Sequence, residues 1–198
     1  MVAALTMPNL IAHYRQQEVS TRLKKFYSLF NQAIILSQID NGPVTDWSRA
    51  DNLKGEDDED SKVKNFDEMS RFWNKYFAPY IRTLKIENGS DIGQAKIYLP
   101  DGSTILAWNG GCMSFSFDTN GDKKPNIPGK DIYLFHFCHK KAEQNLYLGV
   151  NKAFGPFSMI SATDRQAAYD ECKDKSNCSS LLILYDNFEF KKDYPIKF

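Results

Sequence analysis

The chain has 198 residues, enough to bury one hydrophobic core, and its 25 lysine and arginine residues equal its 25 aspartate and glutamate residues. A chain with no net charge has no overall field to attract nucleic acid or an anionic membrane surface, so the charge balance favours neither partner. Four cysteines in a chain this short are typical of an oxidising compartment.

Residues 1–41 are predicted to form one long helix whose character changes partway. Thr6 and Asn9 are the only polar residues in the first twelve positions, MVAALTMPNLIA. After His13, apolar residues recur at spacings of four and three and so share one helix face: Val19, Leu23, Phe26, Phe30 and Ala33. Such a helix would be about 60 Å long, which exceeds the diameter of one domain.

The two halves of this helix therefore have different expected partners. The second half can lie on a globular head formed by residues 42–198, within a single domain. The first half is apolar on all sides but too short to cross a bilayer, which needs about 20 residues, so it should meet lipid or copies of itself. The predicted assembly surface consists of Val2, Leu5, Met7, Leu10 and Ile11.

Proline and glycine residues mark the ends of the predicted helices. Pro8 either kinks the first helix or stands in its first turn, and both alternatives remain open. Gly42 and Pro43 should end that helix after Asn41. The next segment, residues 43–64, is predicted to be a loop, and its acidic run GEDDEDSK is either a solvated loop or a cation or docking site. A second helix is predicted over residues 66–80, capped by Asn65.

Five strands are predicted after the second helix. The segments AKIYLP (residues 95–100) and STILAW (103–108) flank a turn and should form a hairpin. Residues 112–117 and 132–137 give a third and a fourth strand. Gly155 and Pro156 then mark a turn, Thr163 caps a short helix to about Cys172, and residues 181–185 form a final strand. This order predicts an α+β fold in which the long helix lies on an antiparallel sheet.

The loop DTNGDKKPNIPGKD, residues 118–131, carries oxygen-bearing side chains at spacings typical of calcium loops. The candidate ligands are Asp118, Asn120, Asp122, Asn126 and Asp131. The loop departs from an EF-hand, because Lys123 replaces the glycine and Gly129 replaces the final glutamate of that motif. The alternative is a rigid turn built on Asn120 and Gly121. Calcium is the one cofactor that the sequence suggests.

The cysteines are predicted to form the disulfides Cys112–Cys138 and Cys172–Cys178, although three pairings are possible in principle. A zinc or thiol site at His136, Cys138 and His139 is disfavoured, because His139 points away from the other two in a strand and a fourth ligand is missing. Ser158, Ser161 and Asp164 have no nearby histidine and no nucleophile-elbow glycines. The sequence therefore shows no converging catalytic groups, and we expect no enzyme activity.

Two strings carry a family resemblance. VAALTMPNLIAHYRQQEVSTRLKKFYSLFNQAI, residues 2–34, resembles the second half of the N-terminal helix of type IV pilins and of type II secretion pseudopilins. CKDKSNCSSLLILYDNFEFKKDYP, residues 172–195, is similar to the cysteine-bounded C-terminal segment of one prepilin-like subgroup, whose tail folds back on the sheet. The middle of the chain resembles that subgroup only loosely.

The resemblance implies a pilin-like fold and a structural role. In that family a basic leader is removed by a peptidase, and a further apolar stretch with a glutamate precedes the part seen here. The resemblance thus implies that Met1 is an added start and that the leader and the first half of the transmembrane helix lie outside this sequence. The implied function is a filament subunit that associates with like subunits, sits in the inner membrane before assembly, and then displays its head in the periplasm or outside the cell. The alternative is a secreted, calcium-stiffened monomeric binding or adhesion module.

Overall fold

A computed structural model describes residues 3–50, 59–89, 94–110, 112–148, 152–158 and 162–198. Its longest element is the helix α1 (Ala3–Asn41), which is continuous through Pro8. The helix therefore does not begin at Pro8, because proline removes one backbone hydrogen bond while the turns on either side can continue. As predicted, α1 ends before Gly42, whose φ is +77° and whose N–H donates to the Gln38 carbonyl at 3.0 Å.

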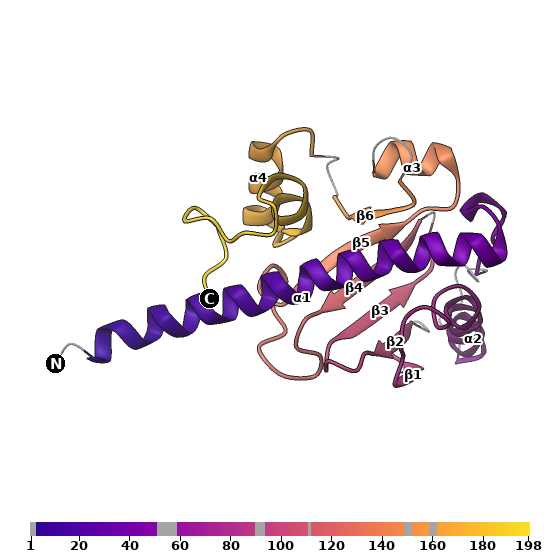
Figure 1. The fold of residues 1–198 in the computed structure, drawn as a ribbon, viewed down its shortest axis with the longest axis horizontal. Helices are drawn as coiled ribbons and strands as arrows, with labels where there is room; N and C mark the ends of the chain where they lie inside the picture. Colours follow the sequence, from indigo (N-terminus) through magenta and orange to yellow (C-terminus); the bar gives the residue numbers. More distant parts are fainter. Residues whose placement is uncertain (1–2, 51–58, 90–93, 111, 149–151, 159–161) are drawn as a thin grey trace.

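The second half of α1 lies across one face of a β-sheet, and its N-terminal part extends beyond the sheet (Figure 1). The Phe26 ring stacks on Phe117 with centroids 4.0 Å apart, and the Phe30 ring stacks on Phe154 at 4.3 Å. The side chains that α1 buries are Val19, Leu23, Phe26, Phe30, Ala33, Ile34 and Ser37. This set contains the whole predicted apolar stripe, so the expected contact face of the helix is confirmed.

The sheet has six antiparallel strands that follow one another in chain order (Figure 1). They are β1 (Lys85–Asn88), β2 (Ala95–Tyr98), β3 (Thr104–Trp108), β4 (Met113–Asp118), β5 (Ile132–Phe137) and β6 (Phe154–Pro156). The face toward α1 buries Phe115, Phe117 and Phe135, whereas Lys96 and Ser114 on the other face stay partly exposed. A sheet buried on one face alternates in this way. The predicted α+β class and the hairpin of β2 and β3 are confirmed.

The second helix, α2 (Glu59–Tyr76), begins and ends earlier than predicted. Asn65 lies inside it rather than at its cap, and its end falls before Pro79, because a proline disfavours helical geometry in the residue that precedes it. Part of the acidic run is thus helical, while residues 55–58 of that run lie outside the described residues. Between α1 and α2, a short 3-10 turn, η1 (Val44–Asp46), buries Val44.

The turn predicted at Gly155 and Pro156 is instead the edge strand β6. Its Phe154 side chain is buried between Phe30 of α1 and Phe135 of β5, with ring centroids 4.3 and 5.1 Å away. Proline is compatible with an edge strand because no neighbouring strand requires its missing N–H. Burial of Phe154 therefore favours the strand over the turn that Gly155 and Pro156 predicted. The helix α3 (Lys141–Tyr147), which precedes β6, was not predicted.

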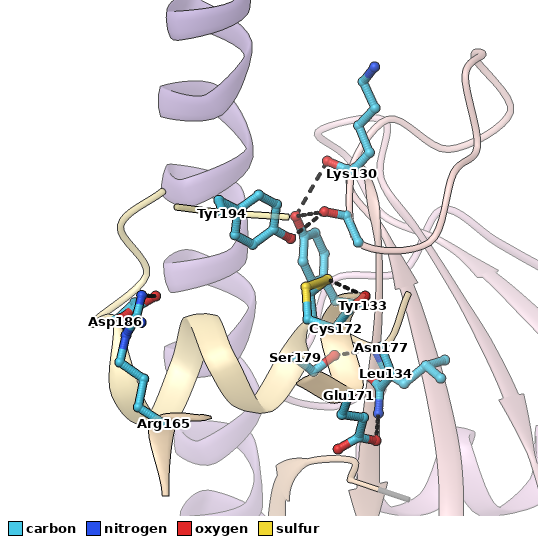
Figure 2. Close-up of a disulfide and its surroundings, with 12 residues drawn as sticks. Lys130, Tyr133, Leu134, Arg165, Glu171, Cys172, Asn177, Ser179, Asp186 and Tyr194 are labelled. Carbon is cyan, nitrogen blue, oxygen red and sulfur yellow. Dashed lines mark hydrogen bonds and ion pairs between the residues drawn. A yellow bond between two sulfur atoms is a disulfide. The ribbon is translucent and has the colours of Figure 1, made fainter. Parts of the chain in front are cut away.

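The final strand predicted at residues 181–185 is also wrong, because this segment forms the π-helical turn η2 (Leu181–Tyr185) after the helix α4 (Arg165–Lys175). A short apolar run buried on several sides does not distinguish a strand from a helix. Ser179 occupies the strand edge instead, since its hydroxyl accepts the Leu134 N–H of β5 at 2.7 Å (Figure 2). The cap of α4 is Asp164, one residue after the predicted Thr163.

Both predicted disulfides, Cys112–Cys138 and Cys172–Cys178, are present. The second packs against Gly129, where an added Cβ would meet the Cys178 sulfur at 2.6 Å and where φ is +78°, so only glycine fits there. Figure 2 shows the hydroxyls of Tyr133 and Tyr194 gathered beside this disulfide, and both donate to the Gly129 carbonyl. The C-terminal tail thus packs on this loop through Tyr194 and on α1 through Phe188, whose ring centroid lies 5.9 Å from that of Tyr27.

Candidate functional site

The exposed surface of α1 is the first candidate site. Leu10, Ile11 and Tyr14 are all more than half exposed, at 55, 52 and 62%. Among the α1 side chains whose burial the structure describes, from Leu10 onward, the buried stripe begins at Val19. Among the predicted assembly residues, Leu10 and Ile11 are therefore placed on the surface. Val2 lies outside the described residues, and for Leu5 and Met7 the structure gives the helical backbone alone.

The loop between β4 and β5 forms the tight turn that the sequence offered as one alternative. One Asp118 carboxylate oxygen accepts the N–H groups of Asn120 and Gly121, each at 3.0 Å. Gly121 has φ +65°, and an added Cβ would meet the Gly102 carbonyl oxygen at 2.4 Å. Asp118 thus organises the turn through backbone hydrogen bonds, as aspartate commonly does.

Asp131 holds the other end of the same loop. Its carboxylate is buried, and it accepts the Asn120 side-chain amide at 3.0 Å and the N–H groups of Asn126 and Ile127. Burial, together with the nearby negative charge of Asp131, raises the pKa of Asp118 to about 6. The side-chain oxygen of Asn120 is buried and has no hydrogen-bond partner among the described residues.

These contacts bring together three of the five candidate calcium ligands, Asp118, Asn120 and Asp131. Asp122 turns away, because its carboxylate pairs with the Lys96 ammonium and accepts the Tyr98 hydroxyl at 3.2 Å. The Asn126 side chain is exposed, and this residue reaches Asp131 through its backbone. Two carboxylates and an unpaired amide oxygen are the kind of oxygen donors that calcium uses, but six to eight donors are needed. Calcium binding at this loop stays a prediction.

The cysteine and histidine cluster does not form a metal site. Potential ligand atoms of Cys112, His136 and Cys138 lie within 4.8 Å of one another. Both sulfurs are joined in a disulfide, however, so neither is available as a thiolate. Burial lowers the pKa of His136 and of His139 to about 4, with the Arg49 charge adding to the shift at His139. His139 packs against the rings of Phe72 and Phe137 instead of meeting the cluster.

The hydroxyl and carboxylate residues considered for hydrolysis have structural partners. The Ser158 hydroxyl donates to the buried Glu171 carboxylate at 2.6 Å, and the Asn177 amide donates to the same carboxylate at 2.7 Å. Asp164 caps α4 by accepting the Ala167 N–H at 2.9 Å. Ser161 lies outside the described residues. Figure 2 shows the contact of Asn177 with Glu171, which lies within the C-terminal segment.

A comparison with protein-family models places this arrangement in a family. The model described as a family of unknown function, DUF6613, matches residues 9–198. The chain belongs to the DUF6613 family. The matched range runs from the exposed end of α1 through the disulfide-bounded C-terminal segment. Searches of curated proteins and of solved structures found no match to this DUF6613 chain.

A bilayer-spanning helix was also sought in the DUF6613 chain. Within the ranges that the structure describes, no helix is both long enough and apolar enough to cross a membrane. The two disulfides are typical of proteins in an oxidising compartment, such as the periplasm or the extracellular space.

Calcium binding in the DUF6613 loop can be tested by thermal melting with calcium and with a chelator. If an ion holds the loop, calcium should raise the melting temperature, because a ligand that binds only the native state stabilises it, by about 2.7 kcal/mol at a hundredfold excess over Kd. Asp118→Asn should remove this response. Asp122→Asn is the matched control and should keep it, since Asp122 pairs with Lys96. If neither calcium nor chelator changes the melting temperature, the loop is a rigid turn and not a calcium site.

One surface of the DUF6613 chain was missed in the sequence. Ile35, Leu36 and Ile39 lie on the head-packed half of α1 but are exposed by 59, 47 and 75%. Their spacing places them opposite the buried stripe of Phe26, Phe30 and Ala33, which is the signal that could have identified them.

Proposed function

We propose that the chain is a structural subunit of a filament of the type IV pilus or type II secretion pseudopilus class. The subunit polymerises through α1 and displays the sheet and the C-terminal segment at the filament surface. The observation that carries this proposal is the division of α1, which buries Phe26 and Phe30 against the sheet while its N-terminal end leaves the head and exposes Leu10, Ile11 and Tyr14.

The energetics of burial support this division of roles. Each large apolar side chain that enters the core contributes roughly 1.5 to 3 kcal/mol, so the buried stripe suffices to hold the second half of α1 on the head. The exposed end gains no such stabilisation from its own head. Contiguous apolar residues on an exposed surface are typical of interaction sites. Association with copies of the same helix would remove these side chains from water.

The proposal includes a cellular route. The subunit would sit in the inner membrane before assembly, and would then join a filament in the periplasm or outside the cell. The two disulfides fit this route, because the head would fold in an oxidising compartment.

A charge in the exposed end of α1 tests the proposal. We expect Ile11→Glu or Leu5→Glu to abolish filament formation by the natural protein, because an uncompensated charge would have to enter an apolar helix bundle. Filaments are measured by sedimentation and electron microscopy. Thr21→Glu, an exposed position further along the same helix, is the matched control and should assemble normally.

The same experiment needs a check that the head stays folded. Deleting residues 1–12 should leave the melting temperature nearly unchanged, because the first buried residue among the described side chains of α1 is Val19. Normal filaments from Ile11→Glu and Leu5→Glu together would overturn the assembly proposal. A large loss of head stability on the deletion would show that residues 1–12 pack within the monomer.

The second candidate function is a secreted, calcium-stiffened monomeric binding module. The observation that favours it is the buried side-chain oxygen of Asn120, unpaired among the described residues, beside Asp118 and Asp131. This candidate predicts calcium-dependent melting together with a monomeric sedimentation profile under all conditions, whereas the filament proposal predicts self-association whether or not calcium binds.

A further inference from the structure

The outward side of α1 carries two exposed apolar patches with the same internal spacing. We define the N-terminal patch as Leu10, Ile11 and Tyr14, and the C-terminal patch as Ile35, Leu36 and Ile39. In both, the three residues stand at positions i, i+1 and i+4. The corresponding residues are separated by 25 positions in every case: 10 to 35, 11 to 36 and 14 to 39.

The separation places both patches on one side of the helix. At 3.6 residues per turn, 25 residues fall only about 20° short of seven full turns, and at 1.5 Å per residue the patches lie about 38 Å apart along the axis. The positions between them on this side are exposed and polar: Gln17, Thr21, Lys25, Ser28 and Gln32. The patches are therefore two separate surfaces rather than one continuous strip.

Neither patch is covered by the part of the head that the structure describes. The opposite side of α1 is the one that packs on the sheet, through Leu23, Phe26 and Phe30. In Figure 1, α1 crosses the sheet, its N-terminal part extends beyond the sheet, and its C-terminal end reaches the opposite end of the sheet. The C-terminal patch thus stands on the part of the helix that packs on the head, where Ile34 and Ser37 are buried, and the N-terminal patch stands on the projecting part.

We infer that the C-terminal patch is the receptor for the N-terminal patch of a second copy of this chain, with the two α1 helices parallel and offset by 25 residues. This inference rests on the proposed filament function and names its contact surface. A 25-residue offset brings all three residues of one patch level with the three residues of the other. The pair then has one free patch of each kind, the C-terminal patch of one copy and the N-terminal patch of the other, so the contact repeats without closing, as head-to-tail interfaces do.

An antiparallel pair of helices would also bring the patches together, but it would close as a dimer. In that arrangement the helices cross midway between the patches, at Lys24 and Lys25. The lysines of the two copies would face each other, and like charges at short range repel. A parallel offset keeps these lysines outside the overlap, where Lys25 retains its ion pair with Asp101 at 3.1 Å.

Engineered cysteines distinguish the two arrangements, because the four native cysteines are all in disulfides. The parallel offset predicts that Tyr14→Cys in one copy cross-links to Ile39→Cys in another. A chain carrying both substitutions should then give a ladder of covalent multimers on a non-reducing gel. The antiparallel arrangement predicts cross-links between Leu10→Cys and Ile39→Cys instead, and only dimers from the chain that carries that second pair.

A charge in the receptor patch gives an independent measurement on filaments of the natural protein. Ile39→Glu should raise the concentration needed for assembly by about tenfold or more, because an uncompensated charge would enter the apolar contact. A tenfold change corresponds to about 1.4 kcal/mol. Its melting temperature should not change, because Ile39 is 75% exposed. Thr21→Glu serves again as the control, with unchanged assembly.

The outcomes separate this inference from the proposed function. Suppose that filaments form and Ile11→Glu stops them, but Ile39→Glu assembles normally and the chain with both Tyr14→Cys and Ile39→Cys gives no cross-links. The receptor assignment is then wrong while the filament function stands. Dimers as the end product would replace the parallel offset with the antiparallel pair. If neither filaments nor cross-links form under any condition, both proposals are wrong.

Discussion

Replacing Phe26 with alanine is expected to lower the free energy of unfolding by about 3 to 5 kcal/mol, as a large-to-small change in a packed core does. The Phe26 ring is 3% exposed and stacks on Phe117 at 4.0 Å with an angle of 7° between the rings. It also meets the rings of Phe30, Phe135 and Phe154 within 6.1 Å. The substitution would leave a cavity at the main contact between α1 and the sheet.

The measurement is denaturant unfolding followed by circular dichroism. Tyr14→Ala on the same helix is the matched control and should change stability by less than about 0.5 kcal/mol, because Tyr14 is 62% exposed. Similar losses for the two variants would show that the projecting end of α1 packs on the head, which would also undermine the proposed division of the helix.

Acidification from pH 7 to pH 4 is expected to destabilise the folded chain by about 4 kcal/mol through the combined titration of His136, His139 and Asp118. Burial lowers the pKa of both His136 and His139 from 6.5 to about 4. Between these values the unfolded chain binds protons that the folded chain excludes, so stability is lost as the pH falls. Each histidine contributes about 3 kcal/mol to this loss.

Asp118 has the opposite effect on the pH dependence of stability and reduces the net loss on acidification. Burial raises its pKa from 3.8 to about 6, so the folded chain binds this proton before the unfolded chain does. Its contribution to stability is therefore complete below pH 3.8 and is lost as the pH rises through 6. During acidification, protonation of Asp118 offsets about 2 kcal/mol of the stability that the two histidines lose. The offset is not larger because the partial exposure of this carboxyl screens its interactions.

A single substitution tests this account. His139 has no hydrogen-bond partner at either ring nitrogen among the described residues, and it packs against Phe72 and Phe137, so His139→Leu should preserve the packing. We expect unfolding curves between pH 7 and pH 4 to show a loss smaller by about 3 kcal/mol in this variant. His13→Leu, at an exposed position of α1, should leave the pH dependence unchanged. An unaltered acid loss in His139→Leu would assign the destabilisation to other groups.

The sequence by itself determined the elements whose signals are local. The stripe of Leu23, Phe26 and Phe30 and the cap at Gly42 located the contact face and the end of α1, because a helix repeats its contacts within a few residues. The hairpin of β2 and β3 was predictable from alternation around a tight turn. The disulfide Cys172–Cys178 follows from proximity in the chain, since only six positions separate the two residues.

Only the tertiary structure decided the segments whose local signals compete with long-range contacts. Pro156 signals a turn, yet Phe154 fits between α1 and β5, so the segment adds to the sheet as β6. The apolar run of η2 suits a strand equally well, but Ser179 already occupies the edge of β5.

The candidate sites show the same limit. The spacing of Asp118 and Asp122 gives no hint that Lys96, from a distant strand, removes Asp122 from the loop. Nor does the spacing of Ile35 and Ile39 show whether another element covers them, because burial depends on how segments far apart in the chain come together. The physical reason is that periodicity specifies which side chains share a face, whereas packing decides what that face meets.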